Sequence, residues 1–299
     1  MKADCLIIGG GPAGLVAATY LGRFRRSVLL TDSGASRASW IPVSHNVLGF
    51  SKGVSGPDLL DLLRAQADRY GARRITGEVQ SLVRAEGAFL ARWRNGEIRA
   101  DRILLATGGL DIEPEIKDVR KAVKAGLIRH CPICDAYEVA GKKIALVAYG
   151  KCRVKEALLL RGYTSELSVL TLGHSAGIEP DDIAALEDAG VEVILEPIDR
   201  LTREGGKIAA WPRQGKTPLI FDTIYSALGM HLRTELAVAL GAVIDDDGAL
   251  LVDRHQQTTI PNLYAAGDVV HGLSQVSVAA GQAAIAATAI NASLPTIRY

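Results

Sequence analysis

The sequence predicts an α/β protein that contains two nucleotide-binding units, each made of a strand, a turn and a helix. Short apolar runs alternate with helical segments along most of its 299 residues. A glycine-rich turn follows the first of these strands, and Cys131 and Cys134 lie between the two units. Because strands that alternate with helices form parallel sheets covered on both faces, we expect three-layer domains.

Composition argues against several classes of function. Lys and Arg (34) nearly balance Asp and Glu (33), so no net field attracts nucleic acid or an anionic membrane. Four cysteines without a paired framework indicate a reducing compartment, and no signal peptide precedes the first strand, so we expect a cytoplasmic protein. Residues 272–297 carry no formal charge, but polar residues interrupt them and alanine predominates. We therefore expect a packed helix there and no membrane span.

The first unit consists of a strand at residues 3–8, a turn with Gly9, Gly11 and Gly14, and a helix at Pro12–Arg23. In the pattern G-x-G-x-x-G the first glycine makes the tight turn, the second lets a pyrophosphate approach the backbone, and the third allows close packing. The next strand, at residues 27–31, ends at Asp32, whose carboxylate can accept hydrogen bonds from an adenosine ribose. The unit predicts a bound dinucleotide whose phosphates rest on the helix N-terminus.

The alternation continues on both sides of the cysteines. Before them we expect a helix at Gly56–Tyr70, hairpins turning at Glu86–Gly87 and Asn95–Gly96, and a strand at Asp101–Leu105 that runs into Ala106, Thr107 and Gly108. After a crossover at Glu113–Pro114 we expect helices at Tyr149–Leu160 and Pro180–Ala189 and strands at Lys142–Val147, Leu167–Leu172, Val191–Leu195, Ile208–Trp211 and Pro218–Ala227. The segment Ala249–Asp253 begins the return to the first domain.

The segment Cys131–Asp135, C-P-I-C-D, predicts a redox-active dithiol. Thiols two residues apart can close a disulfide across one helical turn, and a helix N-terminus favours the thiolate of the leading cysteine. Pro132 suits the first helical position, and the Asp135 carboxyl can carry the proton that thiol–disulfide exchange moves. The alternatives are a zinc half-site, for which no second ligand pair is present, and a structural disulfide, whose loop would be too short to restrict the unfolded chain much.

A late motif, Pro261–Asp268, places a Gly267–Asp268 turn at the end of a strand. The Asp268 carboxylate can bond a ribityl hydroxyl of a flavin, and the helix that starts near Gln275 aims its positive end at the ring. This dipole would stabilise an anionic reduced flavin. The alternative is a plain turn or a helix-capping acid at Asp268.

Together these residues resemble the low-molecular-weight thioredoxin reductase family over essentially the whole chain. The matching motifs are G-G-G-P-A-G-L at Gly9–Leu15, A-T-G at Ala106–Gly108, C-P-I-C-D at Cys131–Asp135 and A-A-G-D at Ala265–Asp268. The resemblance implies two Rossmann-like domains, the second inserted in the first. Residues 1–113 and 248–299 would bind one FAD, and residues 114–247 would carry the dithiol. It also implies a homodimer.

The resemblance assigns roles by position. Cys134 would exchange electrons with the flavin, Cys131 would attack the disulfide of a thioredoxin-like protein or other substrate, and Asp135 would be the acid/base. Besides the glycines, the residues that contact FAD would be Pro12, Ala13, Asn46, Gln275 and Val276. Ser274 stands where an arginine is usual in the family. His130 is either an extra proton carrier or a surface or capping residue.

The second nucleotide site departs from the family pattern. NADPH-using relatives carry G-x-G-x-x-A there, but this chain reads A-Y-G-K-C-R at residues 148–153. Arg153 puts a long side chain where close helix–strand packing wants alanine, and residues 172–177 lack the arginines that bind a 2′-phosphate. We therefore expect function without NADPH, as in the pyridine-nucleotide-independent branches of the family.

Two other electron donors fit this basic stretch. Gly150, Lys151, Arg153 and Lys155 could hold a second FAD or dock an acidic carrier such as ferredoxin; a solvated basic face is the alternative. The chain ends in Tyr299, which we expect to stack on or near the flavin ring, a frayed tail being the alternative.

The sequence thus predicts an FAD-dependent thiol–disulfide oxidoreductase of the thioredoxin reductase type. Three alternatives stay open: an ordinary NADPH-dependent thioredoxin reductase, a dithiol oxidase that uses O₂, and a non-catalytic flavin redox sensor. Asp135 argues against the oxidase, because a histidine commonly follows the second cysteine in those relatives. The intact dithiol argues against the sensor.

Overall fold

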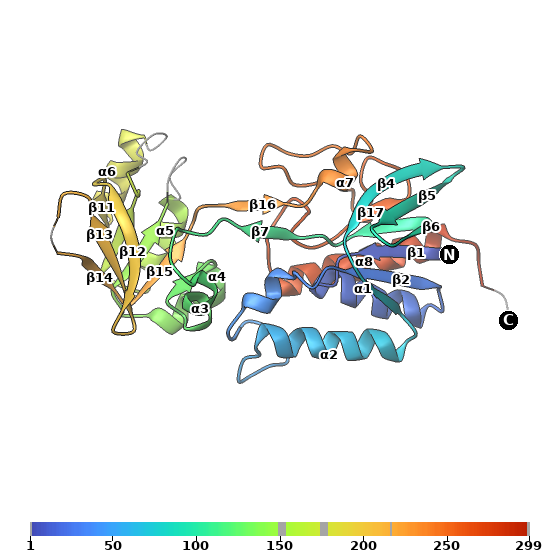
Figure 1. Ribbon diagram of the computed structural model, residues 1–299, viewed down its shortest axis with the longest axis horizontal. Helices are drawn as coiled ribbons and strands as arrows, with labels where there is room; N and C mark the ends of the chain where they lie inside the picture. Colours follow the sequence, from blue (N-terminus) through green and yellow to red (C-terminus); the bar gives the residue numbers. More distant parts are fainter. Residues whose placement is uncertain (1, 149–153, 174–178, 216, 298–299) are drawn as a thin grey trace.

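The computed structural model describes residues 2–148, 154–173, 179–215 and 217–297, which fold into two lobes (Figure 1). Two short antiparallel strands, β7 (Gly109–Asp111) and β16 (Met230–Leu232), carry the chain out of the first lobe and back into it. The first lobe holds both the beginning of the chain and the last described helix. The fold is therefore α/β with a second Rossmann-like lobe inserted in the first, as the sequence predicts.

The first sheet has the strand order β3-β2-β1-β6-β5-β4, and β17 also pairs with β6. Its strands are β1 (Lys2–Ile8), β2 (Val28–Asp32), β3 (Arg73–Thr76), β4 (Val79–Ala85), β5 (Ala88–Trp93), β6 (Gly96–Leu105) and β17 (Leu263–Ala265). The long strand β6 pairs antiparallel with β5 along its first half and parallel with β17 along its second half. The sequence from the two ends of the chain therefore meets in one sheet.

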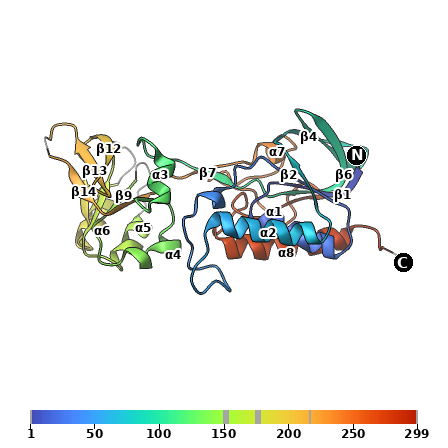
Figure 2. The same cartoon turned by 60° about the horizontal axis from the view of Figure 1, so that its bottom comes forward.

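Alternating side chains of this sheet build two apolar layers. From β1, Ile7 packs toward the helices α1 (Pro12–Arg23), α2 (Gly56–Arg69) and α8 (Val276–Ser293), which cover one face (Figure 2). Leu6 and Ile8 pack on the other face, against the β4–β5 hairpin and α7 (Glu235–Val238). The two layers make the three-layer arrangement that the alternation of elements predicts.

The second sheet is parallel, in the order β11-β10-β9-β15-β8. Its strands are β8 (Ile128–Arg129), β9 (Ile144–Val147), β10 (Leu167–Leu170), β11 (Glu192–Ile194) and β15 (Thr223–Ser226). Helices α5 (Val154–Arg161) and α6 (Pro180–Asp188) cover one face. The other face is covered by α3 (Val119–Lys124) and by an antiparallel sheet of β12 (Ile198–Glu204), β13 (Lys207–Pro212) and β14 (Leu219–Phe221).

One predicted strand is wrong. The segment Pro218–Ala227 is not one strand, because Asp222 divides it between β14 in the antiparallel sheet and β15 in the centre of the parallel sheet. The Asp222 side chain accepts a hydrogen bond from the backbone of Lys143 at 2.9 Å, which fixes the turn. The segment Ala249–Asp253, where we expected the return to the first domain to begin, forms isolated bridges.

The chain returns to the first lobe before residue 248, where we expected the second domain to end. Ala237 and Ala242 already pack in the core of the first lobe. At the same junction Thr107 Oγ1 donates to the carbonyl of Arg233 at 2.7 Å, and the backbone N–H of Arg233 donates to the carbonyl of Gly108. The domain limits stay a prediction, and we refine the second limit to a position before Ala237.

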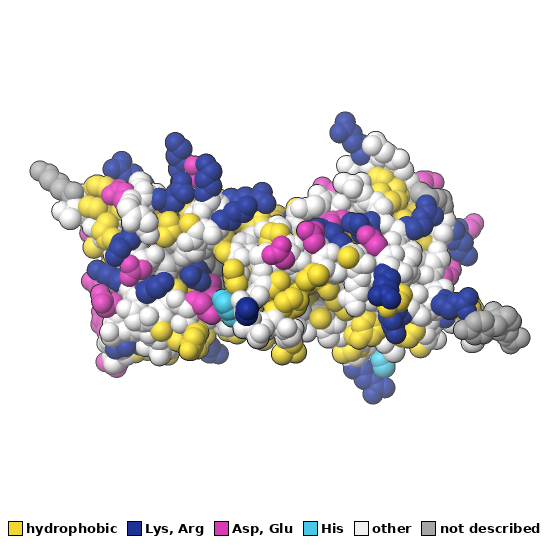
Figure 3. Space-filling model, turned by 90° about the horizontal axis from the view of Figure 1, so that it is seen from below, with side chains coloured by type: hydrophobic (Ala, Val, Ile, Leu, Met, Phe, Trp, Pro, Cys, Tyr) yellow, Lys and Arg dark blue, Asp and Glu magenta, His cyan; other side chains and the backbone are white. Residues whose placement is uncertain are grey.

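Helix α8 is long and apolar enough to pass a length and hydropathy test for a membrane span. One face of it packs on the first lobe, where Ala279, Ala283, Ala286, Ala287 and Ile290 are buried against α1 and the sheet. In all, 28% of the helix is buried. On the face drawn in Figure 3, basic and acidic side chains are interspersed over both lobes, in keeping with the near balance of 34 and 33.

Candidate active site between the two lobes

A cleft of about 430 Å³ lies between the lobes, within the range of small-molecule and cofactor sites. Most of the predicted cofactor residues line it: Gly9, Gly11, Pro12, Ala13, Asp32, Asn46, Ala106, Thr107, Gly108, Gly267, Asp268, Gln275 and Val276. So do Cys131, Cys134 and Asp135 from the second lobe. The structure thus brings together residues that lie more than 200 positions apart in the sequence.

Some predicted residues do not line the cleft or cannot be placed. Gly14 lies behind the glycine turn, where it contacts the backbone. Lys155 is exposed on α5 and is not among the residues that line the cleft. Gly150, Lys151, Arg153 and Tyr299 fall outside the described residues.

The glycine turn between β1 and α1 is shaped by close backbone contacts. Gly9 has φ +117°, and a Cβ there would lie 2.1 Å from the carbonyl oxygen of Ala106. A Cβ on Gly14 would lie 1.9 Å from the carbonyl oxygen of Gly9, so α1 can start this close to β1 only with glycine. A Cβ placed on Gly11 would have Ser36 Oγ, at 3.3 Å, as its nearest neighbour, so the backbone of Gly11 is open to the cleft. The turn fits a dinucleotide phosphate in the way the motif predicts.

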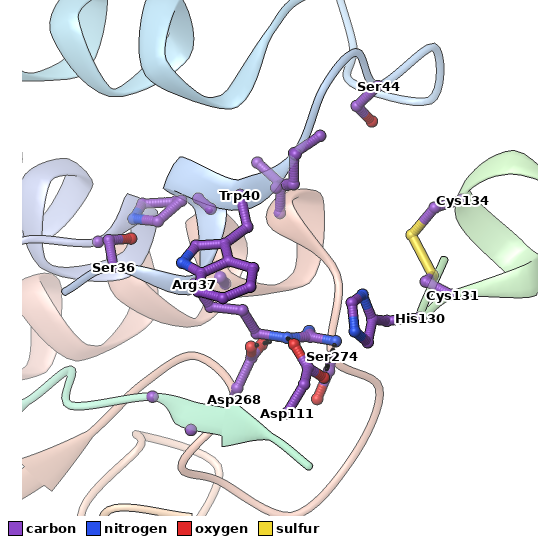
Figure 4. Close-up of a pocket in the computed structure, with 18 of the residues that line it drawn as sticks. Ser36, Arg37, Trp40, Ser44, Asp111, His130, Cys131, Cys134, Asp268 and Ser274 are labelled. Carbon is purple, nitrogen blue, oxygen red and sulfur yellow. Dashed lines mark hydrogen bonds and ion pairs between the residues drawn. A yellow bond between two sulfur atoms is a disulfide. The ribbon is translucent and has the colours of Figure 1, made fainter. Parts of the chain in front are cut away.

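Arg37 joins three segments of the cleft and was not predicted. It begins a short 3₁₀ helix, Arg37–Trp40, and its guanidinium binds both carboxylate oxygens of Asp111 at 2.6 and 2.7 Å (Figure 4). It also donates to Asp268 at 3.3 Å. Burial alone would lower the pKa of Arg37, but the hydrogen bonds and negative charges of Asp111 and Asp268 together outweigh burial and raise that pKa. Arg37 is therefore charged and connects the Gly267–Asp268 turn to the strand β7 that leaves the lobe.

Cys131 and Cys134 form a disulfide at the N-terminus of the one-turn helix α4 (Pro132–Asp135), with Cys131 as the N-cap residue. Pro132 occupies the first helical position, as predicted. The amide of Gln275, the N-cap of α8, donates to both sulfurs, at 3.2 Å from Cys131 and 3.3 Å from Cys134. Gln275 also accepts a hydrogen bond from Asn46 at 3.0 Å. The disulfide therefore contacts one predicted flavin-site residue, Gln275, which in turn bonds another, Asn46.

Asp135 is held by donors from two neighbouring strands. Arg129, the last residue of β8, donates to one carboxylate oxygen at 2.6 Å, and the buried Tyr225 of β15 donates to the other at 2.7 Å. Burial raises the pKa of Asp135 and outweighs the opposing effects of Arg129 and Tyr225. Burial likewise raises the pKa of Tyr225, so the phenol keeps its proton. The acid/base candidate thus sits in a defined polar pocket with a raised proton affinity.

His130 bonds Glu113 at 2.9 Å and has only 13% of its side chain exposed, so it is not a free surface residue. Ligand atoms of Asp111, Glu113 and His130 lie within 4.8 Å of one another. Arg37 already binds both oxygens of Asp111, and His130 and Glu113 bind each other. The ligand atoms of this group are therefore occupied by an ion pair and a hydrogen bond within the protein.

Sequence reasoning missed Arg37, Asp111, Arg129 and Tyr225. Arg129 lies two positions before Cys131, and a residue that close to a dithiol is a reasonable candidate. Tyr225 has no such signal, because it comes 90 positions after Asp135 and reaches it only through the pairing of β15 with β8, where Tyr225 lies opposite Arg129.

Comparisons with known proteins agree with this geometry. Residues 3–283 match the family described as pyridine nucleotide-disulphide oxidoreductase. The chain belongs to this family. A thioredoxin reductase from Listeria monocytogenes is 24% identical over 95% of this chain and 91% of its own length. NADPH-dependent thioredoxin reductase 3 from Arabidopsis thaliana is 27% identical over 95% of this chain and 57% of its own length.

Among solved structures, the crystal structure of HlmI is 32% identical and superposes with a TM-score of 0.89 over 97% of this chain and 92% of its own. Together with the disulfide in the cleft, these matches identify the chain as a flavin-dependent disulfide oxidoreductase of the thioredoxin reductase type. The resemblance seen in the sequence is confirmed at the level of the family.

Proposed function

We propose that this protein moves electron pairs between FAD, the Cys131–Cys134 dithiol and the disulfide of a thioredoxin-like partner, without NADPH. The observation that carries the proposal is the disulfide facing the cleft, hydrogen-bonded to Gln275 opposite the glycine turn. FAD would lie on the Gly9–Gly14 turn, with Asp32 toward its ribose and Asp268 and Gln275 toward its flavin. When bound, it supplies and accepts the electron pair.

The protein's own groups divide the remaining chemistry. In the reduced dithiol, the thiolate of Cys131 attacks the partner's disulfide, and the electron pair of that broken bond goes to the leaving sulfur. Cys134 then attacks the mixed disulfide and releases the second sulfur. Asp135 supplies a proton to a leaving thiolate, for which a raised pKa is suited. One disulfide forms in this protein as one opens in the partner.

Independence from NADPH rests on the sequence of the second nucleotide site. Arg153 replaces the small residue of the usual turn, and residues 172–177 provide no arginine for a 2′-phosphate. Ferredoxin, docked on the basic stretch that includes Lys155, is the proposed donor, and a second FAD bound there is the other. Homodimer formation and a cytoplasmic location remain part of the proposal.

An ordinary NADPH-dependent reductase is the second candidate. It is favoured by the matched family, which is described by its pyridine nucleotide, and by the Arabidopsis relative, whose name states NADPH dependence. The two candidates share the FAD site and the dithiol and differ only in the donor.

An anaerobic titration of the purified flavoprotein separates them. NADPH, NADH and reduced ferredoxin are added in turn while flavin bleaching is followed, with the ratio of flavin to protein measured on the same sample. We expect no bleaching by either nucleotide, and either bleaching by ferredoxin or a flavin ratio near two. Stoichiometric bleaching by NADPH would establish the ordinary reductase.

The dithiol is tested in the same experiment. Cys134→Ser should still accept electrons into FAD but should not reduce a disulfide substrate. Cys5→Ala is the matched control, because Cys5 is a buried free cysteine of β1 outside the cleft. A wild type that reduces no disulfide but consumes O₂ with a dithiol would be the oxidase, and one with neither turnover would be the sensor.

A further inference from the structure

We propose that Arg129, Tyr225 and Glu138 form a proton-holding cluster around Asp135, behind the dithiol. Arg129 and Tyr225 are positioning residues that stabilise the anionic form of Asp135. The negative charge of Glu138 favours the protonated form. This inference rests on the proposed role of Asp135, but it gives a role to three residues that belong to none of the sequence motifs.

The fold places these groups without any help from the dithiol motif. Arg129 and Tyr225 lie opposite each other on the parallel strands β8 and β15, so their side chains share one face of the sheet. Only two residues, His130 and Cys131, separate the end of β8 from the start of α4, which brings Asp135 over that face. The two donors then meet different oxygens of the same carboxylate, at 2.6 and 2.7 Å.

This arrangement restricts where the Asp135 carboxylate can point. Among the described residues, both of its hydrogen-bonded oxygens have partners in the sheet, and neither bonds a sulfur of the oxidised dithiol. Asp135 is 22% exposed and Arg129 is 18% exposed, so solvent competes little for these bonds. The clamp therefore fixes the distance and the orientation from which Asp135 works.

The charges of the cluster favour one bound proton. The Arg129 guanidinium pairs with Asp135, and the negative charge of Glu138 acts on both Asp135 and Tyr225. The Glu138 Oε2 atom is buried and has no hydrogen-bond partner among the described residues, and the same is true of Arg129 Nε. A carboxyl oxygen left in this state is costly as an anion. A proton bound to Asp135 removes the repulsion between the charges of the two acids, which is why Glu138 raises the pKa of Asp135.

Other ionisable groups near this pocket have their own partners. His130 bonds Glu113, and on α5, which packs against α4, Lys155 is exposed and Arg161 donates to the carbonyls of Thr164 and Ala189. Glu156 on the same helix is half-buried. None of them is a hydrogen-bond partner of Asp135 within the described part of the chain.

The cluster balances the protons of the proposed reaction. The reduced protein holds one proton on a cysteine and one on Asp135. As the dithiol closes to a disulfide, two electrons pass to the partner's disulfide, and these two protons leave on the two thiols that it becomes. Asp135 remains as an anion, stabilised by Arg129 and Tyr225, until it takes up a proton from solvent before the next turnover.

The test is the pH dependence of disulfide reduction by chemically pre-reduced protein. Activity that needs a protonated Asp135 falls at high pH, through the pKa of that group. Tyr225→Phe removes one donor to the anion, so the falling limb should move up by about one pH unit. Arg129→Gln should move it further in the same direction. Glu138→Gln removes a negative neighbour and should move it down.

Two further variants serve as controls. Asp135→Asn should abolish the limb, and Tyr264→Phe should leave it in place, because Tyr264 is a buried tyrosine (4% exposed) of the first sheet, outside the cleft. Tyr225→Phe keeps the buried ring and Glu138→Gln keeps its shape, so both should fold. Identical limbs in wild type, Tyr225→Phe and Glu138→Gln would overturn the cluster.

A second readout works without a donor or partner. In the reduced protein, the rate at which iodoacetamide alkylates Cys134 should show a step with pH that Asp135→Asn removes and Tyr225→Phe moves upward. If these steps behave as stated while the wild type reduces no disulfide, the proposed function fails and the cluster stands. Steps that Tyr225→Phe and Glu138→Gln leave unmoved refute the cluster whatever the activity.

Discussion

The two walls of the cleft are built from different parts of the chain, backbone in one lobe and side chains in the other. In the first lobe the glycine wall, the turn between β1 and α1, is made of backbone: Gly9 and Gly14 bring β1, α1 and the Ala106 carbonyl so close that side chains cannot fit. In the second lobe the wall is side chain: Arg129 and Tyr225 reach from the strand ends to Asp135 beside the disulfide. The first wall is suited to a ligand's phosphates, and the second to moving a proton.

This difference decides how each wall tolerates change. The glycine wall fails when a Cβ is added at Gly9 or Gly14, because the neighbouring carbonyls cannot move far without breaking the sheet. The side-chain wall changes its proton affinity when one donor is removed, while the strands beneath it stay paired. Substitutions at Gly9 or Gly14 should therefore abolish binding, and those at Arg129 or Tyr225 should shift a pH profile.

The largest effect is expected from Gly14→Ala. The new Cβ would lie 1.9 Å from the carbonyl oxygen of Gly9, so α1 must move away from β1. We expect a loss of about 3 kcal/mol or more in the free energy of unfolding, together with most of the co-purified FAD. Urea denaturation and the flavin absorbance of the purified protein measure both.

Gly281→Ala is the matched control in the same lobe. Gly281 is exposed on α8, and no atom lies within 4 Å of a Cβ placed there. The alanine should retain flavin and stabilise the helix by about 0.5–1 kcal/mol. Equal losses from both substitutions would mean that the contact with Gly9 does not shape the wall.

Arg37→Gln should have an intermediate effect, because Arg37 lies where the first wall meets the link between the lobes. Its removal leaves Asp111 and Asp268, which are 17% and 19% exposed, without their cation. We expect a loss of about 2 kcal/mol. Arg92→Gln, in the exposed pair with Glu97, should change the free energy of unfolding by less than about 0.5 kcal/mol. If the two variants lost the same free energy of unfolding, the Arg37 bridge would stabilise the protein no more than an exposed ion pair does.

The contrast between the walls also explains what the sequence could predict. The glycine wall was predicted with its spacing, and α1 has the predicted bounds Pro12–Arg23, because a phosphate-binding turn needs glycine at fixed intervals. Helix α8 likewise follows Gln275 as expected. Local rules suffice where the chain must bend or pack closely within a few residues.

The side-chain wall depends on strand pairing, which a local pattern does not contain. Tyr225 meets Asp135 only because β15 enters the sheet between β9 and β8, and the sequence around it predicted one strand at Pro218–Ala227. The short strands β7 and β16 were also missed, since three residues show no periodicity. Arg37 was missed because its partners Asp111 and Asp268 lie 74 and 231 positions away in the sequence, beyond the reach of a local pattern.

The smallest effect, and the one that tests the second wall most directly, is the pH dependence of stability in Asp135→Asn. Burial raises the pKa of Asp135 in the folded protein, so the folded state binds this proton more tightly than the unfolded chain does. As pH rises above about 4, the unfolded chain releases the proton first. The contribution of Asp135 to wild-type stability should then fall by about 1.4 kcal/mol per pH unit until the folded pKa is passed.

Asparagine cannot titrate, so the stability difference between Asp135→Asn and wild type should grow across that window and be constant above it. Urea denaturation of the oxidised proteins over a pH series measures the difference, and the intact disulfide keeps the unfolded chains comparable. In Tyr225→Phe the carboxylate loses a donor, so its own window should extend to higher pH. A difference that stays flat with pH would show that the side-chain wall does not hold the proton, even if the glycine wall behaves as described.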